Sequence, residues 1–252
     1  MGTALITGAS AGLGLEFAWQ LATARHNLVL VARDATRLEE HAGRLRAAAG
    51  VDVEVLQADL ADRVQLDRVA ERLGADRRPI GLLVNNAGFG ASSSFTETPL
   101  AESERALDVM IRAVMVLSRA AADHMAPRGH GAILNVSSIA GYMASGVYSA
   151  TKAWVTTFSE SLATELSGTG VTVTALLPGL TRTEFHSRAG IDTSRHPDFA
   201  WLSAAEVVSC ALSDVRRGAV LSTPSCGYSL AIGLARLAPR WLIRSISQTP
   251  RR

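Results

Sequence analysis

The sequence predicts a single α/β domain, residues 1–252, built on a doubly wound parallel sheet of about seven strands. Short runs rich in β-branched and other apolar residues alternate with longer stretches of helical periodicity. Several of these runs are continuously apolar, as expected for parallel strands covered by helices on both faces. The expected strands are Thr3–Thr7, Leu28–Val31, Val53–Gln57, Leu82–Asn85, Ala132–Val136, Val171–Leu177 and Ala219–Leu221.

The stretches between these strands have the spacing of amphipathic helices. After the first strand, apolar residues recur four positions apart at Leu13, Phe17 and Leu21. The longest apolar stripe lies in the expected helix Leu100–Met125 and includes Met110. Because a helix separates consecutive strands, the chain reads as repeated β-α-β units, which give a parallel sheet.

Composition excludes several classes of protein. Apolar residues make up 48% of the chain and charged residues 19%, which suits a packed core and argues against global disorder. A net charge of +2 is too small to indicate nucleic-acid binding. No apolar run approaches the ~20 residues of an integral membrane span, and no basic leader precedes the first strand. The two cysteines, Cys210 and Cys226, indicate reduced thiols in a cytoplasmic protein and no metal site.

One long stretch, residues 181–203, has no clear periodicity. Irregular segments of this length are usually functional lids or disordered. This one is too apolar for plain disorder, and we expect it to be a substrate lid. Its bulky apolar residues are Phe185, Ile191, Phe199, Trp201 and Leu202.

The C-terminal segment 227–247 is helical in pattern and has a basic stripe. Its three arginines, Arg236, Arg240 and Arg244, are four residues apart and lie among leucines, a tryptophan and an isoleucine. Such a stripe is compatible with a helix that lies on a membrane surface or packs against another subunit. It is equally compatible with a helix that closes the substrate side of the domain and has a solvated basic edge.

A glycine-rich turn joins the first strand to the first helix. The turn reads Thr7-Gly8-Ala9-Ser10-Ala11-Gly12-Leu13-Gly14. Glycines permit a tight turn and let a phosphate approach the backbone, while the helix N-terminus presents free N–H groups and a partial positive charge. Because a strand precedes the turn and an amphipathic helix follows it, we predict a dinucleotide-binding, Rossmann-type fold rather than an ordinary turn.

The end of the second strand indicates which dinucleotide is bound. NAD sites usually have an acidic residue there, but this chain has Ala32 followed by Arg33. A guanidinium can bind a 2′-phosphate through two hydrogen bonds, so Arg33 favours NADP(H), with Arg37 as a weaker second contact. NAD(H) stays possible, since Asp34 is close enough to turn inward and Arg33 is compatible with a solvated surface position.

The central chemical feature is Tyr148-Ser-Ala-Thr-Lys152. Residues i and i+4 lie on one face of a helix, and Lys152 is the only lysine beside 24 arginines. An ammonium near a phenol favours the phenolate and lowers a pKa that is normally about 10. We therefore predict that Tyr148 is an acid/base group that exchanges a proton with a carbonyl or alcohol oxygen. The alternative is a surface tyrosine beside a solvated lysine.

A serine pair follows the fifth strand. Side chains just beyond the carboxyl ends of parallel strands face the ligand crevice, and Ser137 and Ser138 stand at this position. A hydroxyl there can donate a hydrogen bond to a substrate oxygen. Ser138 fits this role better, with Ser137 as the alternative, and an ordinary turn serine is the simplest interpretation.

Together these residues resemble the short-chain dehydrogenase/reductase family over nearly the whole chain. The glycine turn is similar to the family's cofactor motif, and Asn85-Asn86-Ala87-Gly88 is similar to its signature after the fourth strand. Ser138, Tyr148 and Lys152 match its catalytic residues. The resemblance implies that Ser138 orients the substrate oxygen, that Tyr148 donates the proton, and that Lys152 binds the nicotinamide ribose and lowers the tyrosine pKa.

The same resemblance implies a set of cofactor contacts. Asp59 stands where the family contacts adenine, and the segment from Pro178 to Thr183 resembles the one that meets the nicotinamide carboxamide. The full expected set is Gly8, Ser10, Gly12, Leu13, Gly14, Arg33, Asp59, Leu60, Asn86, Ala87, Gly88, Tyr148, Lys152, Pro178, Gly179, Thr181 and Thr183.

Two features depart from the family pattern. Ser138 and Tyr148 are ten residues apart, which is shorter than the commoner spacing and shortens the loop that holds Tyr142 and Met143. The family usually has an asparagine where alignment places Met110, in a proton relay that depends largely on a backbone carbonyl. We expect activity to be retained, and core packing explains Met110 equally well.

These observations predict an NADP(H)-dependent oxidoreductase that transfers a hydride between nicotinamide and the carbonyl or secondary-alcohol carbon of a hydrophobic ketone or 3-oxoacyl-type substrate. Alternatives are an NAD-linked alcohol or hydroxysteroid dehydrogenase and a catalytically weak nucleotide-binding regulator. The resemblance also implies a homodimer or homotetramer that packs through the helix Leu100–Met125 and the helix of Tyr148.

Overall fold

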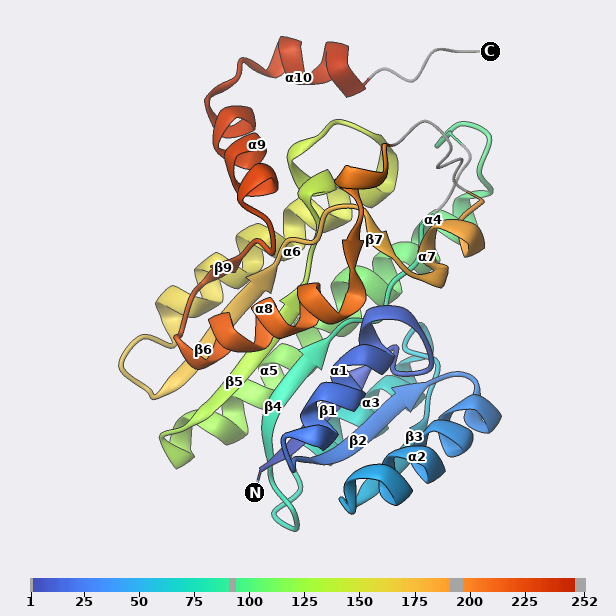
Figure 1. Ribbon diagram of the computed structural model, residues 1–252, viewed down its shortest axis with the longest axis vertical. Helices are drawn as coiled ribbons and strands as arrows, with labels where there is room; N and C mark the ends of the chain where they lie inside the picture. Colours follow the sequence, from blue (N-terminus) through green and yellow to red (C-terminus); the bar gives the residue numbers. More distant parts are fainter. Residues whose placement is uncertain (1, 91–93, 191–196, 248–252) are drawn as a thin grey trace.

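Within residues 2–90, 94–190 and 197–247, which the computed structural model describes, seven parallel strands form one sheet in the order β3-β2-β1-β4-β5-β6-β9 (Figure 1). The strand order starts at β1 and runs outward in both directions, which is the doubly wound arrangement. The strands are β1 (Thr3–Thr7), β2 (Asn27–Ala32), β3 (Val53–Gln57), β4 (Ile80–Asn85), β5 (Gly131–Val136), β6 (Val171–Leu176) and β9 (Leu221–Ser222).

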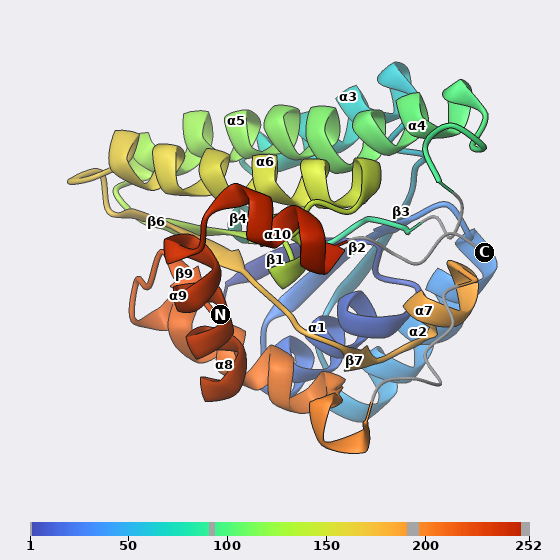
Figure 2. The same cartoon turned by 90° about the horizontal axis from the view of Figure 1, so that it is seen from above.

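Helices cover both faces of this sheet (Figure 2). Helices α1, α2 and α8 lie on one side, and α3, α4, α5 and α6 lie on the other. The bounds are α1 (Gly12–Thr23), α2 (Ala35–Ala49), α3 (Arg63–Leu73), α4 (Leu100–Leu107), α5 (Ala113–Met125), α6 (Gly146–Glu165) and α8 (Ala204–Arg216).

The alternation of strand side chains builds two cores, one on each face of the sheet. In β1, Ala4 and Ile6 join the core under α1 and α2, while Leu5 joins the core on the opposite face. These three residues have no exposed surface. Covering both faces explains why the strand sequences are continuously apolar, and it confirms the predicted parallel sheet.

Two expected helices are interrupted. A π-helical turn, Asp108–Arg112, joins α4 to α5 within the expected helix 100–125, and Met110 lies in it. The C-terminal segment 227–247 forms two helices, α9 (Cys226–Leu237) and α10 (Arg240–Ser247), because Pro239 lacks an N–H and disfavours helical geometry at the residue before it.

The segment 181–203 is more regular than expected. A short parallel pair, β7 (Thr181–Arg182) with β8 (Leu202–Ser203), closes its two ends, and the helix α7 (Glu184–Arg188) follows β7. The carboxyl ends of the strands, β7, α7, α9 and α10 all lie at the same end of the molecule (Figure 1). Ile191 lies outside the described residues.

No helix in the described ranges is long and apolar enough to cross a bilayer. The Cys210 and Cys226 thiols are free.

The first turn of α1 approaches the sheet very closely. A Cβ added at Gly14 would lie 2.2 Å from the Gly8 carbonyl oxygen and 2.5 Å from Asn86 Nδ2. Both neighbours are parts of the turn and of the segment after β4, so neither moves freely. Gly14 is therefore required by packing, not by backbone conformation.

We expect Gly14→Ala to lower the free energy of unfolding by about 1–3 kcal/mol, because the new methyl group overlaps backbone. The matched control is Gly43→Ala in α2, where a Cβ meets nothing within 4 Å. That control should raise the free energy of unfolding by about 0.5–1 kcal/mol. Urea denaturation measures both, and equal effects would contradict the packing described here.

Candidate active site

Hydrogen bonds from the segment that follows β4 hold the glycine turn in place. The Thr7 hydroxyl accepts hydrogen bonds from the backbone N–H groups of Asn86 (2.9 Å) and Ala87 (3.0 Å), and Asn86 Nδ2 donates to the Thr7 carbonyl (2.9 Å). Gly8 has φ 67°, and a Cβ there would lie 2.8 Å from Asn86 Nδ2. Residues from two predicted motifs thus form one rigid turn.

The N-terminus of α1 is left free to bind an anion. Asp34 and Asp62 cap the helices α2 and α3 with side-chain hydrogen bonds, but α1 begins after Ala11 with no side-chain cap. Its first N–H groups therefore lack side-chain acceptors, and phosphate oxygens are well suited to accept from them. The expected residues Ser10 and Leu13 lie in this turn, with Leu13 packed against the core beneath it.

The end of β2 offers one uncommitted cation. Arg33 is exposed, and in the described part of the chain its guanidinium takes part in no ion pair. The Asp34 carboxylate accepts from the N–H of Arg37 at 3.0 Å, so it is occupied as a helix cap and does not turn inward. The structure therefore leaves the Arg33 side chain available to a ligand, while Asp34 caps α2.

The side chains of Asp59 and Leu60, which were expected at an adenine site, are engaged elsewhere in the protein. Asp59 is bound by Arg105 (2.7 Å) and accepts from the N–H of Ala61 (3.0 Å). Burial acts to raise the pKa of Asp59, but the hydrogen bond from Arg105 and that from Ala61 outweigh it, and the pKa is lowered. Leu60 is buried in the core. The Asp59 N–H also has a partner, because it donates to Gln65 Oε1 at 2.9 Å.

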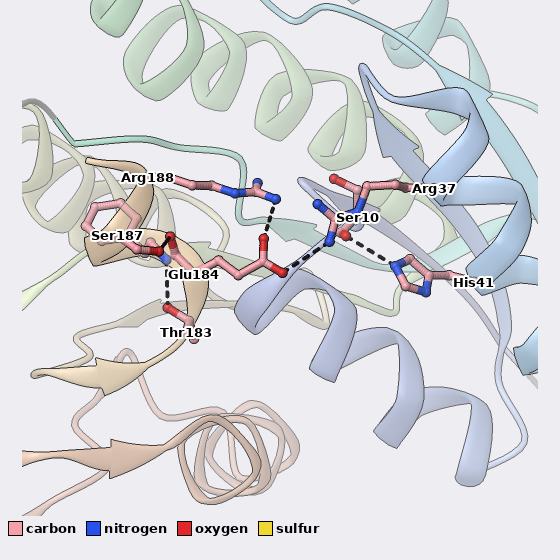
Figure 3. A network of polar contacts seen from close by, with 8 residues as sticks. Ser10, Arg37, His41, Thr183, Glu184, Ser187 and Arg188 are labelled. Atoms are coloured by element: carbon pink, nitrogen blue, oxygen red, sulfur yellow. Dashed lines mark hydrogen bonds and ion pairs between the residues drawn. The ribbon is translucent and has the colours of Figure 1, made fainter. Parts of the chain in front are cut away.

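A charged network crosses from α2 to α7 beside the glycine turn (Figure 3). Glu184 lies between Arg37, at 3.1 Å, and Arg188, with which it also forms an ion pair. The hydrogen bond from Arg37 is the main cause of the lowered pKa of Glu184. Thr183 caps α7, and a Cβ on Gly12 would lie 3.4 Å from the Thr183 Cβ. The segment after β7 therefore lies directly over the glycine turn.

Arg37 is thus committed to Glu184 and not to an open 2′-phosphate position. Sequence reasoning did not find Glu184, because the two residues are 147 positions apart and share no motif. Within the carboxamide segment, the Thr181 hydroxyl donates to the Gly179 carbonyl (3.0 Å), and the Pro178 carbonyl accepts from Ile139 N–H (3.2 Å).

The structure brings Ser138, Tyr148 and Lys152 together at the carboxyl end of β5. Ser138 begins the 3-10 turn Ile139–Tyr142, and its hydroxyl lies near enough to the Tyr148 hydroxyl to act on the pKa of the phenol. Tyr148 and Lys152 lie on one face of α6, with Lys152 Nζ 5.7 Å from the centre of the Tyr148 ring. Ser137 does not share this position, because its hydroxyl donates to the Lys152 carbonyl at 2.7 Å.

Lys152 is a buried cation that, within the described residues, has one hydrogen-bond acceptor for its Nζ. Its side chain is 5% exposed, and Nζ donates to the Val136 carbonyl at 2.7 Å. Removal from water lowers the pKa of Lys152 to about 8. An ammonium has three N–H donors, so two are left for a ligand, such as the hydroxyl groups of a ribose.

The Tyr148 phenol does not have the lowered pKa that the sequence predicted. Burial raises the pKa of Tyr148 to about 12, and the hydrogen bond with Ser138 acts in the opposite direction without cancelling it. Lys152 is turned toward Val136, so in the chain alone its charge does not outweigh the loss of hydration. Tyr148 is consequently a neutral phenol at neutral pH.

A chain of buried side-chain hydrogen bonds joins β4, β5 and α6 and fixes α6 on the sheet. Asn85 Nδ2 donates to Asn135 Oδ1 (2.9 Å), and Asn135 Nδ2 donates to Ser159 Oγ (2.9 Å). Closer to the site, a Cβ on Gly141 would lie 2.9 Å from the Lys152 carbonyl carbon. The short loop can therefore lie directly on α6, which lets Ser138 reach Tyr148 across only ten residues.

Apolar side chains surround the reactive hydroxyl. The Phe185 ring, from α7, lies 5.7 Å from the Tyr148 ring, and Phe89 and Val147 pack in the same cluster. Met110 is 2% exposed in this cluster, and its Sδ lies 3.3 Å from the position of a Cβ on Gly88. The same Cβ position is 3.7 Å from Lys152 Nζ.

These features fit a dinucleotide. The glycine turn and the uncapped α1 follow β1, Gly88 follows β4, and Lys152 donates to the end of β5, so all of them lie at the carboxyl edge of the sheet. Within the described ranges, no three His, Cys, Asp or Glu side chains are placed to hold a metal ion.

A doubly wound sheet with a serine, a tyrosine and a buried lysine beside a phosphate-binding turn defines a nucleotide-dependent oxidoreductase. The family model described as short chain dehydrogenase matches residues 2–193. The chain therefore belongs to the short-chain dehydrogenase family, whose members act on CH–OH and C=O groups.

Solved structures and curated relatives agree with this family. A short-chain dehydrogenase from Sphingobium yanoikuyae in complex with NADPH is 38% identical, with a TM-score of 0.88 over 100% of this chain and 98% of that one. A bulky-bulky ketone specific alcohol dehydrogenase from Comamonas testosteroni is 34% identical, with a TM-score of 0.82 over 100% and 97%. An NADP-dependent 3-hydroxy acid dehydrogenase of Escherichia coli is 34% identical over 180 residues, 70% of this chain and 71% of the relative.

The buried charge of Lys152 predicts a gain in stability on its removal. A pKa lowered from 10.5 to about 8 corresponds to about 3 kcal/mol of destabilisation, present in full below pH 8. Lys152→Met loses the bond to Val136, so we expect a net gain of about 1–2 kcal/mol in the free energy of unfolding at pH 7. Urea denaturation across pH measures it.

The sign of the pH dependence is the control. Between pH 8 and 10.5 the folded wild-type chain binds fewer protons than the unfolded chain, so its stability rises with pH relative to the variant. The advantage of Lys152→Met should therefore shrink over this range. A pH-independent difference would contradict a buried ammonium.

Proposed function

We propose that this protein is an NADPH-dependent reductase of bulky, apolar ketones or 3-oxoacyl-type substrates. The observation that carries the proposal is the placement of Tyr148 near Ser138 and one helical turn from the buried Lys152, whose Nζ lies 5.7 Å from the centre of the Tyr148 ring. The nicotinamide supplies the hydride. The protein groups supply orientation and the proton.

Each of the three residues has a separate task. Ser138 donates a hydrogen bond to the carbonyl oxygen of the substrate and holds it near Tyr148. Tyr148 then gives its hydroxyl proton to that oxygen as negative charge develops on it. Lys152, anchored on the Val136 carbonyl, binds ribose hydroxyls with its two remaining N–H groups, and its charge favours the phenolate that is left behind.

The preference for NADP(H) rests on the end of β2. Arg33 is exposed and uncommitted within the described residues, whereas Asp34 is occupied as the cap of α2. The relatives from Sphingobium and Escherichia coli are named for NADPH or NADP, which supports the same choice. Arg37 is a minor contributor, because Glu184 already binds it.

The substrate class rests on the surroundings of Tyr148. The apolar side chains of Phe89, Val147 and Phe185 lie in the cluster around Tyr148. A substrate that buries apolar groups against them would bind more tightly. The relative from Comamonas is named for bulky ketones. The segment 181–203, which carries Phe185, is proposed as the lid over this substrate.

Assembly and location complete the proposal. Exposed Leu100, Leu107 and Met115 lie along α4 and α5, which supports a homodimer or homotetramer built through this face and α6. Two free thiols and a reducing cofactor support a cytoplasmic location.

Removal of one oxygen atom tests the function. Tyr148→Phe keeps the ring that packs against Phe185 and deletes the proton. In a screen of NADPH oxidation with bulky ketones and 3-oxoacyl thioesters, we expect kcat to fall by at least ~100-fold. NADPH affinity, measured by fluorescence titration, should change less than about twofold. Full turnover by the variant, or no turnover by the wild type on any carbonyl, would favour a nucleotide-binding regulator instead.

Substitution of Arg33 tests the cofactor choice. Losing a charge-assisted contact to the 2′-phosphate should raise the KM for NADPH by roughly tenfold or more in Arg33→Ala, and leave the KM for NADH nearly constant. The matched control, Arg37→Ala, should have a smaller effect on NADPH, because Arg37 is paired with Glu184. If Arg33→Ala weakens both cofactors equally, the protein does not select NADP(H) in this way.

A further inference from the structure

The C-terminal end of the chain differs in charge from the rest. Asp214 is the last acidic residue, so all 23 acidic side chains of the chain lie at or before that position. The segment from Cys226 to the C-terminus contains five arginines and no acidic residue. Residues 226–252 are therefore strongly positive in a chain that is nearly neutral as a whole.

The same segment exposes large apolar side chains. Half of the large apolar residues that the described part of the chain leaves exposed lie between residues 230 and 246. Leu230, Leu234 and Leu237 share one face of α9 and are 67%, 61% and 86% exposed. Trp241 and Ile246 of α10 are 64% and 63% exposed. Scattered exposed leucines are ordinary, but this concentration is not.

Both helices are nevertheless anchored to the domain. Ile232 and Ile243 are buried, and the Ser247 hydroxyl accepts from the Ala144 N–H at 3.0 Å. Tyr228 donates to the Ala200 carbonyl at 2.7 Å. The exposed residues are therefore presented outward by a folded element.

We propose that α9 and α10 form a docking surface for an anionic lipid bilayer. The C-terminal surface, defined by Leu234, Leu237, Trp241, Arg240 and Arg244, combines the apolar and aromatic groups that enter the headgroup region with arginines that pair with anionic headgroups. Neither helix is long enough to span a bilayer, so the contact is interfacial.

Charge decides against a second copy of the chain as the occupant. A two-fold interface built on this surface brings Arg240 and Arg244 of one copy toward the same positive surface of the other. In the described residues neither arginine has an acidic partner, while Arg236 is paired with Glu160 at 3.4 Å. An anionic bilayer satisfies these charges, and an identical positive surface repels them.

The C-terminal surface lies beside the candidate active site, so docking would serve the reaction. This part of the inference rests on the proposed function. Tyr142, in the loop beside the reactive residues, accepts from Arg236 at 2.9 Å, and the Tyr228 hydroxyl accepts from the Leu180 N–H at 3.3 Å. Helix α9 thus contacts both the loop that holds Tyr142 and the segment Pro178–Thr183, and α10 contacts the same loop through Ser247 and Ala144. Docking brings the mouth of the site to the lipid surface, where apolar carbonyl compounds concentrate.

Flotation of the full-length protein with vesicles tests the proposal. We expect binding to mixed vesicles of phosphatidylcholine and phosphatidylglycerol in which roughly one lipid in three is anionic. Binding to pure phosphatidylcholine should be at least tenfold weaker, and about 0.5 M NaCl should abolish binding to the anionic vesicles by screening the charges. The double variant Leu237→Ser/Trp241→Ser and the double variant Arg240→Gln/Arg244→Gln should each bind at least tenfold more weakly.

Matched controls separate this surface from general stickiness and from the enzyme activity. Val64→Ser/Val220→Ser removes exposed apolar groups elsewhere and should bind vesicles as the wild type does. Tyr148→Phe should also bind normally, so failure of the proposed reaction leaves the docking test intact. Circular dichroism and NADPH affinity verify that each variant is folded.

Two results would overturn the proposal. One is a wild-type protein that stays in the soluble fraction with the anionic vesicles. The other is a Leu237→Ser/Trp241→Ser variant that binds vesicles normally but shifts to a smaller species in analytical ultracentrifugation, which would assign the surface to subunit packing.

Discussion

The burial of one ammonium group organises the candidate active site. Lys152 is held on the Val136 carbonyl with no carboxylate beside it among the described residues, and burial brings its pKa to about 8. Such a group is unfavourable in the folded chain alone, because its two remaining donors have left water without gaining acceptors. In the function proposed here, the ribose of a bound dinucleotide would supply these acceptors. The buried Lys152 ammonium lowers the free energy of unfolding at the place where a ligand is expected to bind.

The surrounding architecture keeps this ammonium in place. The side-chain hydrogen bonds from Asn85 through Asn135 to Ser159 fix α6 on the sheet. Gly141 lets the loop between Ser138 and Tyr148 lie directly on that helix. Tyr148 then has its hydroxyl at Ser138 and its ring against Phe185, in surroundings that keep it neutral. The proposed proton donor, Tyr148, and the proposed cofactor anchor, Lys152, are thereby set by the same helix, one turn apart.

Local patterns predicted the fold and the proximity of Tyr148 and Lys152, because their signals are short in sequence. Continuous apolar strands indicated the sheet, and the spacing of Tyr148 and Lys152 indicated the shared helix face. Interactions between distant segments were not predictable. The Arg37–Glu184 pair, the contact of Phe185 with Tyr148 and the commitment of Asp59 to Arg105 have no pattern along the chain. The lowered tyrosine pKa was wrong because spacing carries no information about burial.

The most direct test uses the fact that the chain has one lysine. NMR of protein labelled with ¹⁵N-lysine gives a single side-chain signal, whose titration reports the charge of Lys152 itself. The account predicts a pKa of about 8 without dinucleotide, and a higher pKa once NADP is bound, because new acceptors favour the ammonium. A pKa near that of a solvated lysine, unchanged by NADP, would contradict it.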